Sequence, residues 1–239
     1  MIKNYIRRFY FFIFKLYYTF FSKNYFNYEK NFFDRKALIN LCLFFYGHNA
    51  KYLEIGVFKN EVFNSIPLTL ENKVGVDPIE GGTHRLESDV FFKQYNKEIY
   101  NVIFIDGLHI YEQIKKDFIN SYNSLSSEGI ILLHDLLPLN SFTQSRLRKT
   151  SVWNGDVWKF AIELSKLFKE DFIISNIDYG VGVFKKNKKQ NVNQSTWNQY
   201  DFSQYDIEKF MSNEVQNLKI LSCFDTIQFI HNYFLDDKK

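Results

Sequence analysis

The stretch NVIFIDGLHIYEQIKKDFINSYNSLSSEGIILLHD, residues 101–135, decides the fold. Its apolar runs at 101–106 and 129–135 predict two strands that are covered on both faces, as in a parallel sheet. Between the two runs, apolar side chains recur at helical spacing with lysines opposite, at Tyr111, Ile114, Phe118 and Tyr122. The stretch therefore predicts a βαβ unit with a crossover helix.

Further apolar runs extend this unit in both directions. Strands are expected upstream at 51–57 and 73–77, and a closing pair is expected downstream at 172–175 and 180–184. The sequence thus predicts an α/β fold. We expect a Rossmann-like doubly wound sheet, mostly parallel with an antiparallel edge strand, plus N- and C-terminal helical extensions.

The length of 239 residues suits one such domain with additions at both ends. Residues 1–50 are expected to form an N-terminal helical extension and 51–185 the ligand-binding domain. Residues 186–239 are expected to form a polar linker and a C-terminal helical extension, which either caps the domain or makes a homo-oligomer contact. Asn154 is predicted to cap a helix that carries Asp156 in its first turn.

Charge and cysteine content exclude some classes of function. The formal net charge of +3 is spread along the chain and forms no basic stripe, so we expect no nucleic-acid partner. Cys42 and Cys223 lie far apart without a CxxC motif, which argues against a disulfide framework and a thiolate metal site. A reducing, cytoplasmic location is expected.

The N-terminal stretch MIKNYIRRFYFFIFKLYYTFF is aromatic and basic. Lys15 interrupts it, and its apolar runs are far shorter than the ~20 residues of a membrane span. No small-residue cleavage site follows, so we predict neither a transmembrane helix nor a cleaved signal. The favoured interpretation is a helix packed on the domain. The alternative is a helix lying on the inner face of the membrane as a peripheral contact.

Residues at the strand ends indicate a cofactor site, because doubly wound sheets bind ligands at the carboxyl ends of their strands. Glu54 and Gly56 close the first strand in LEIGVFKNEVF, where a glycine lets a ligand approach the backbone. Asp77 ends the second strand with a carboxylate suited to two ribose hydroxyls. A turn glycine and a helix-capping aspartate remain the structural alternatives.

The spacing from Gly56 to Asp77 also fits a nicotinamide dinucleotide site. That site requires a G-x-G-x-x-G loop for its pyrophosphate, whereas GVFKNEV contains a single glycine. A cofactor without phosphates makes a smaller demand on this loop. The sequence therefore favours S-adenosylmethionine.

Two further strand ends, FIDGLHIYE and ILLHD, carry acid–base and metal-binding side chains. Asp106, His109, His134 and Asp135 are expected to converge at one mouth of the sheet. Taken singly, each has a structural alternative, such as a helix cap or a hydrogen-bonded core histidine. Together they predict a catalytic or metal-binding cluster.

These segments resemble the class I S-adenosylmethionine-dependent methyltransferases grouped with the macrocin-type and cephalosporin-type O-methyltransferases. The resemblance covers roughly residues 51–184, and IDGxHxYE with a later HD is its most specific part. It implies that Glu54 and Gly56 hold the methionine end, Asp77 the ribose, and Ser88 and Asp89 the adenine side. It also implies cofactor and metal roles for Asp106, a divalent cation on Asp106, His134 and Asp135, and a general base at His109.

Two residues depart from the family pattern. Asn60 stands where many relatives have glycine, so the loop at the methionine end is expected to be tighter or differently turned. His134 stands where metal-dependent members often have a carboxylate, which shifts the preference from Mg²⁺ toward Mn²⁺. A metal-free mechanism with His109 or His134 alone remains the alternative.

The resemblance implies an O-methyltransferase acting on a hydroxyl of a sugar, nucleotide sugar or glycan precursor. The alternatives are an NAD-dependent oxidoreductase and a non-catalytic docking protein. A loop at 136–153 is expected to cross the mouth of the site. Its basic residues Arg146, Arg148 and Lys149 either attract a phosphate-bearing acceptor or are simply solvated. Trp153 is expected to stack on a sugar ring or to join the core, and Trp158 is expected in the core.

Overall fold

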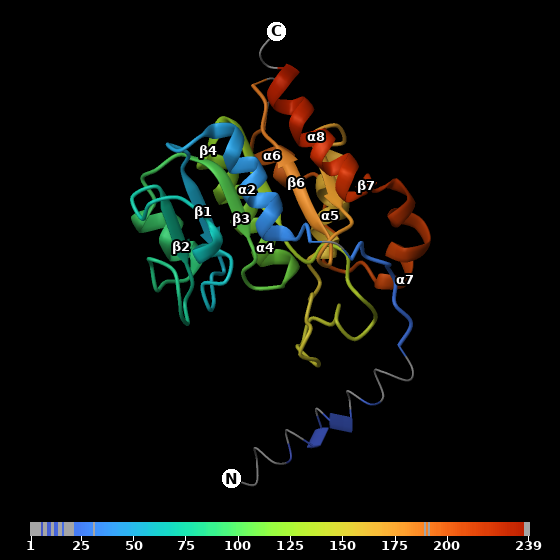
Figure 1. Ribbon diagram of the computed structural model, residues 1–239. Coiled ribbons are helices and arrows are strands. Elements are labelled where there is room, and N and C mark those ends of the chain that lie inside the picture. Colours follow the sequence, from blue (N-terminus) through green and yellow to red (C-terminus); the bar gives the residue numbers. More distant parts are fainter. Residues whose placement is uncertain are drawn as a thin grey trace.

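The computed structural model describes residues 6, 9, 10, 12, 13, 16, 22–30, 32–188, 190 and 192–236. It contains a seven-stranded sheet with helices on both faces (Figure 1). The strands are β1 (Tyr52–Ile55), β2 (Lys73–Val76), β3 (Tyr100–Ile105), β4 (Leu125–Leu133), β5 (Phe172–Ser175), β6 (Val181–Lys185) and β7 (Ile220–Leu221). The longer helices are α2 (Arg35–Tyr46), α4 (Tyr111–Asn123), α5 (Trp158–Leu167) and α8 (Cys223–Asp236). Short helical turns are η1 (Phe63–Ser65), α3 (Ser88–Val90), η2 (Phe91–Tyr95), α6 (Gln194–Trp197), α7 (Ile207–Lys209), η3 (Phe210–Glu214) and η4 (Val215–Asn217).

The strand order is β2-β1-β3-β4-β6-β5-β7. The chain runs outward from β1 to β2 and then returns across β1 to β3 and β4, all parallel. This reversal between β1 and β3 creates the crevice in which doubly wound sheets bind ligands. The predicted fold class is confirmed. Its antiparallel strand, however, lies inside the sheet, because β6 folds back between β4 and β5 and pairs with both.

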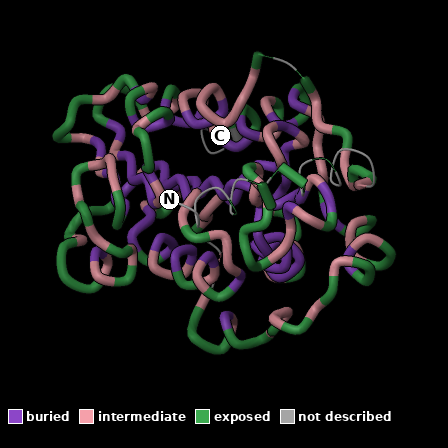
Figure 2. The backbone as a smooth tube through the Cα atoms, turned by 90° about the horizontal axis from the view of Figure 1, so that it is seen from below, coloured by how far each residue is buried: buried purple, intermediate pink, exposed green. Residues whose placement is uncertain are grey.

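Alternating side chains of the central strands pack into two apolar layers, one on each face of the sheet. Ile103 and Ile105 of β3 pack with α4 and α5, whereas Val102 and Phe104 pack with α2 and α8 on the other face. Each fully buried side chain of this size contributes roughly 1.5–3 kcal/mol through removal of apolar surface from water. Figure 2 shows the buried backbone running through the centre of the molecule. The sheet edge that carries the site is thereby held on a rigid frame.

The start of α4 is fixed by a residue far along the chain. Asp156 Oδ1 accepts a hydrogen bond from the backbone N–H of Tyr111 at 2.8 Å and so caps the helix. The prediction that Asn154 caps the next helix is wrong, since α5 begins after Val157 without a side-chain cap. The Asn154 amide instead donates to Asp135 Oδ1 at 2.8 Å. Both contacts tie the loop after β4 to the site.

The C-terminal part both continues the sheet and covers it. The first part of the predicted C-terminal helical extension is broken into α7, η3 and η4, and Phe210 packs on Trp158 with ring centroids 4.6 Å apart. The chain then adds β7 parallel to β5 and ends in α8. Trp158 is 1% exposed, which confirms its predicted core position.

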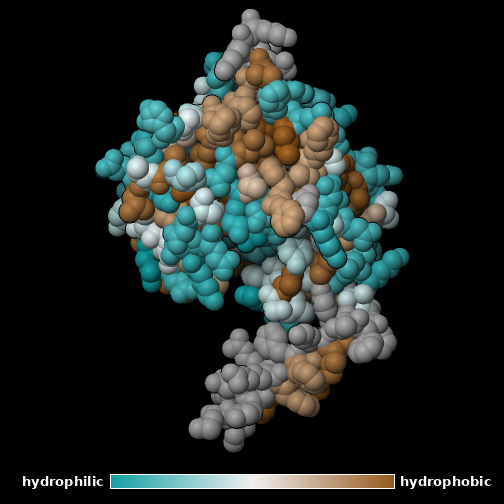
Figure 3. Space-filling model, viewed as in Figure 1, coloured by the Kyte–Doolittle hydropathy of each residue, from teal (hydrophilic) through white to brown (hydrophobic). Residues whose placement is uncertain are grey.

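Six residues of the aromatic N-terminal stretch are described, and all six are helical. Their side chains are 44–62% exposed, at Ile6, Phe9, Tyr10, Phe12, Ile13 and Leu16. They lie beyond the body of the domain (Figures 1 and 3), so the favoured interpretation of a packed helix is wrong for these residues. The remainder of residues 1–21 lies outside the described part. Among the described helices, none has the length and apolarity needed to cross a membrane.

Candidate cofactor and metal site

A cavity of about 770 Å³ opens at the carboxyl ends of β1, β2, β3 and β4. Every site residue predicted from the sequence lines it: Glu54, Gly56, Asp77, Ser88, Asp89, Asp106, His109, His134 and Asp135. Seven of these residues were predicted from their places at strand ends, and Ser88 and Asp89 were implied by the resemblance alone. Their individual roles remain predictions.

Gly56 brings the ends of β1 and β3 together. It adopts φ +89°, and a Cβ added there would lie 2.1 Å from the backbone oxygen of Asp106. No side chain fits in this position, and the backbone conformation itself is one that glycine adopts most readily. The residue thus joins the strand end that carries Glu54 to the strand end that carries Asp106.

Asp77 is held by three backbone N–H groups. Its Oδ2 accepts from Phe58 at 2.9 Å, and its Oδ1 accepts from Ile79 and Glu80 at 2.8 and 3.0 Å. These bonds fix the orientation of a carboxylate that is 7% exposed and borders the cavity. The remaining lone pairs can accept from ligand hydroxyls.

Asn60 replaces the expected glycine without disturbing the turn. Its backbone adopts φ +63°, a left-handed conformation that asparagine tolerates better than most residues. Its Oδ1 accepts a hydrogen bond from the Gly82 N–H at 2.8 Å and ties the loop after β1 to the loop after β2. The neighbouring Phe58, at φ +47°, is also left-handed. Asn60 therefore holds a backbone conformation that glycine also adopts, and the expected tighter or different turn of this loop stays a prediction.

Glu54 is a buried carboxyl group at the end of β1. It is 1% exposed, and Tyr52 donates its hydroxyl hydrogen to Oε2 at 2.8 Å. Burial raises the pKa of Glu54 from 4.5 to about 8. Such a group contributes stability that is fully present below pH 4.5 and is lost as the pH rises through 8.

Replacing Glu54 with glutamine is therefore expected to remove this pH dependence. Relative to the wild type, the Glu54→Gln protein should gain about 1.4 kcal/mol of unfolding free energy per pH unit between pH 4.5 and 8. Urea unfolding at several pH values measures this difference. Glu71→Gln, at an exposed site, is the matched control. A difference that stays constant with pH contradicts the assignment.

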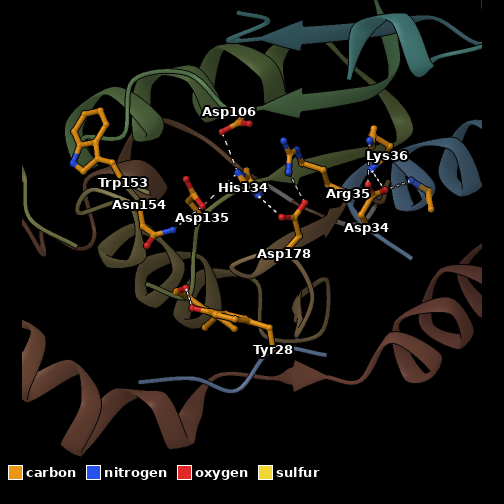
Figure 4. Close-up of polar contacts among 12 residues, drawn as sticks. Tyr28, Asp34, Arg35, Lys36, Asp106, His134, Asp135, Trp153, Asn154 and Asp178 are labelled. Carbon is orange, nitrogen blue, oxygen red and sulfur yellow. Dashed lines mark hydrogen bonds and ion pairs between the residues drawn. The ribbon is translucent and has the colours of Figure 1, made fainter. Parts of the chain in front are cut away.

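Two carboxylates and two imidazoles lie together in the pocket, and Figure 4 shows three of these groups, Asp106, His134 and Asp135. His134 Nδ1 lies 3.2 Å from Asp106 Oδ1 and 3.4 Å from Asp135 Oδ1. His109 bridges the same carboxylates, with Nδ1 3.0 Å from Asp135 Oδ2 and Nε2 3.3 Å from Asp106 Oδ1. One ligand atom from each of Asp106, His134 and Asp135 lies within 4.8 Å of the others. This donor set fits a divalent cation.

The electrostatics of this cluster favour positive charge between the carboxylates. Burial acts to raise the pKa of Asp106, but His134 and His109 outweigh it and hold the pKa well below its ordinary range. Burial acts to lower the pKa of His109, yet hydrogen bonds to Asp106 and Asp135 raise it to about 10. His134 is shifted in the same direction. A bound cation would compete with these protons for the same oxygens.

Trp153 sets the orientation of His109. The two rings stack with centroids 5.2 Å apart and planes 13° apart. His109 Nδ1 lies 2.7 Å from the backbone oxygen of Trp153, and since a carbonyl only accepts, Nδ1 must donate. This tautomer leaves Nε2 as the basic atom of the neutral ring. Trp153 is half-buried and lines the pocket, so it does not belong to the core.

Sequence reasoning missed Arg35 and Asp178. Arg35 Nη1 donates to Asp178 Oδ2 at 2.5 Å, and Asp178 Oδ1 lies 3.8 Å from His134 Nε2 (Figure 4). Among the described residues, no partner is hydrogen-bonded to that buried nitrogen. Asp178, Tyr179 and Gly180 all have positive φ, and such a run of left-handed residues is characteristic of functional loops. The only sequence signal was the DYG turn.

The basic loop after β4 contributes one of its three cations to the pocket. Arg146 is engaged elsewhere, donating to both oxygens of Glu112 and to Asp156. Arg148 lines the pocket, where it donates to the backbone oxygen of Ser151 at 3.0 Å. Lys149 is exposed. The loop does border the site, as predicted.

Comparisons with known proteins were made for the whole chain. No family model and no curated protein matches it. Among solved structures, the MycE methyltransferase of the mycinamycin biosynthetic pathway, in complex with Mg, SAH and mycinamycin VI, is 11% identical with a TM-score of 0.36. That match covers 63% of this chain and 50% of MycE, so the chain spans about half the length of MycE.

Two further structures show similar values. A putative caffeoyl-CoA O-methyltransferase from Staphylococcus aureus is 16% identical, with a TM-score of 0.43 and coverage of 67% of this chain and 86% of that one. The N-methyltransferase NodS from Bradyrhizobium japonicum WM9 is 12% identical, with a TM-score of 0.39 and coverage of 64% and 95%. Similarity at this level assigns no function. The fold class rests on the strand order.

Proposed function

We propose that the chain is a class I S-adenosylmethionine-dependent methyltransferase of the macrocin and cephalosporin O-methyltransferase type. One observation carries the proposal: a single cavity joins the strand ends of Glu54, Gly56 and Asp77 to the acid–base cluster around Asp106. The cofactor half would bind methionine and ribose, and the cluster would face the transferred methyl group. The contact of Gly56 with the Asp106 backbone makes the two halves adjacent.

The loop after β1 argues against a nicotinamide dinucleotide. A pyrophosphate is bound at the N-terminus of a helix that follows the first strand directly. In this chain the fully described residues 56–72 between β1 and β2 contain only the short turn η1. S-adenosylmethionine has no phosphate and needs no such helix. The oxidoreductase alternative is therefore disfavoured. A non-catalytic docking role is disfavoured as well, because it does not explain the buried cluster of carboxylates and imidazoles.

We propose methyl transfer to a hydroxyl group, with His109 as general base. Asp106, His134 and Asp135 would hold Mg²⁺ or Mn²⁺, which supplies Lewis acidity that lowers the pKa of a bound hydroxyl. A cation held by Asp106 and Asp135 would take the place of the proton that these carboxylates otherwise keep on His109. The neutral ring could then accept the hydroxyl proton at Nε2 while Trp153 holds it in place. The oxygen would form its bond to the sulfonium methyl as the carbon–sulfur bond breaks, with S-adenosylhomocysteine as the leaving group, and this requires the pocket to orient both molecules.

The acceptor we propose is a sugar, nucleotide sugar or glycan precursor with neighbouring hydroxyls. Arg148 lines the pocket and is suited to a phosphate, and the aromatic residue Trp153 lines it as well. Incubation with methyl-deuterated S-adenosylmethionine, Mn²⁺ and a panel of nucleotide sugars tests this, with mass spectrometry as the readout. We expect one labelled product that Asp106→Asn abolishes. A protein that binds the cofactor but modifies no acceptor with neighbouring hydroxyls contradicts the proposed acceptor class.

We also propose that the N-terminal helix contacts the inner face of the membrane. The described residues there expose apolar side chains, and Arg7, Arg8 and Lys15 of the same stretch supply charge that suits anionic lipids. Deleting residues 1–22 is expected to abolish co-sedimentation with anionic vesicles while leaving cofactor binding intact. Equal sedimentation of the full and shortened chains overturns this contact and leaves a purely cytoplasmic enzyme.

A further inference from the structure

Asp117 is a buried acidic residue in the pocket that the proposed chemistry does not use. It lies on α4, is 1% exposed and lines the same cavity as Asp77. Its Oδ2 lies beside Gly107, which also lines the cavity, since a Cβ added to Gly107 would lie 3.5 Å from that oxygen. A buried carboxyl at this position is costly unless its oxygens are hydrogen-bonded.

The two carboxyl oxygens of Asp117 differ in their partners. Oδ1 accepts from the Ser88 hydroxyl at 2.6 Å and from Gln113 Nε2 at 3.1 Å. Oδ2 has no hydrogen-bond donor within the part of the chain that the structure describes. Burial raises the pKa of Asp117 to about 6, which is the expected sign for a carboxyl with an incomplete set of partners. The arrangement leaves one oxygen for a ligand donor.

Two apolar side chains border the cavity in the same region. Ile79 follows β2 and is 72% exposed, and Leu108 follows β3 and is 53% exposed. They follow the two strands that flank β1, and exposed apolar side chains in a cavity suit contact with the faces of a flat aromatic ring. Ile79 is two residues beyond Asp77, the proposed ribose ligand, and lines the same cavity, so a base attached to that ribose would lie near it.

We propose that Asp117 determines specificity for adenine, with Oδ2 accepting a hydrogen bond from the exocyclic amino group of the base. This inference rests on the proposed cofactor. Ser88 and Gln113 act by orienting the carboxyl group, and Ile79 and Leu108 hold the ring faces. A base with a carbonyl oxygen at the same position would place two acceptors against each other, and the site would reject it.

The test compares S-adenosylhomocysteine with S-inosylhomocysteine, which carries that carbonyl oxygen. Calorimetric titration of the wild-type protein is expected to show roughly ten- to hundredfold weaker binding of the inosyl compound. Asp117→Asn is expected to narrow or reverse the preference for S-adenosylhomocysteine. The asparagine amide can donate to the carbonyl oxygen of the inosyl base and accept a hydrogen bond from its ring N–H. Glu87→Gln, an exposed carboxylate at the pocket rim, is the matched control and should keep the wild-type preference.

Each result has a distinct meaning. Equal binding of both compounds by the wild-type protein overturns the role of Asp117 and leaves the proposed function intact. If a folded Asp117→Asn protein, checked by its melting temperature, keeps the wild-type preference for S-adenosylhomocysteine, the role of Asp117 is likewise overturned and the proposed function stays intact. If the wild-type protein binds neither compound, the proposed function fails, and the inference fails with it. The wild-type comparison alone decides the matter if the variant does not fold.

Discussion

Replacing Gly56 with alanine is expected to lower the free energy of unfolding by about 4 kcal/mol, which is among the largest effects of a single methyl group. The added Cβ would lie 2.1 Å from the Asp106 oxygen and 2.6 Å from Gly107 Cα, so the end of β1 or β3 must move. Either movement also displaces Asp106 from the metal cluster. Chemical denaturation of the purified variant measures the change.

Gly47 provides a matched control for this substitution. It also has a positive φ, of +77°, but a Cβ added there meets nothing within 4 Å. Gly47→Ala should therefore lower the free energy of unfolding by only about 1 kcal/mol, which is the cost of the left-handed backbone conformation for alanine. The difference between the two variants isolates the steric contact at the strand ends. Equal losses in both would show that β1 and β3 do not approach each other as described.

Replacing Asp135 with asparagine is expected to weaken Mn²⁺ binding roughly a hundredfold or more, because a charged ligand becomes neutral. Asp135 adopts φ +64°, a left-handed conformation that asparagine also accepts, so the backbone should not change. Electron paramagnetic resonance of free Mn²⁺ during a titration measures the affinity directly, without an acceptor or a methyl donor.

Glu61→Gln serves as the control for this titration. Glu61 lines the same cavity but is exposed and lies outside the cluster of potential ligands. Its loss should leave Mn²⁺ binding unchanged. If Asp135→Asn and Glu61→Gln behave alike, the cation is held by the general charge of the pocket, and the assignment of a ligand set fails.

The sequence predicted the strand ends well because their signals are local. Apolar runs mark the buried strands, and the polar residues directly after them had to meet at one edge of the sheet. The start of β4 was less predictable. It begins at Leu125, where a register shift lets Leu125 pair with Tyr100 ahead of the apolar run at 129. That pairing depends on the partner strand.

Contacts between distant parts of the chain could not be predicted from pattern. Arg35 meets Asp178 because the first residue of α2 lies beside the turn after β5, although 143 residues separate the two in sequence. Asn154 was predicted as a helix cap because asparagine is common at that position. Its amide instead donates to the buried carboxylate of Asp135, since a charged acceptor forms a stronger hydrogen bond. The pocket position of Asp117 could not be predicted, because the sequence pattern of its helix indicated only the apolar face.

The central claim is that this pocket binds S-adenosylmethionine, and calorimetric titration with S-adenosylhomocysteine tests it most directly. NAD⁺ is titrated in parallel, with and without Mn²⁺, and Asp77→Ala provides the site control. We expect micromolar binding of S-adenosylhomocysteine that Asp77→Ala abolishes, and no binding of NAD⁺. Binding of NAD⁺ instead, or no binding of S-adenosylhomocysteine under any condition, would contradict the claim.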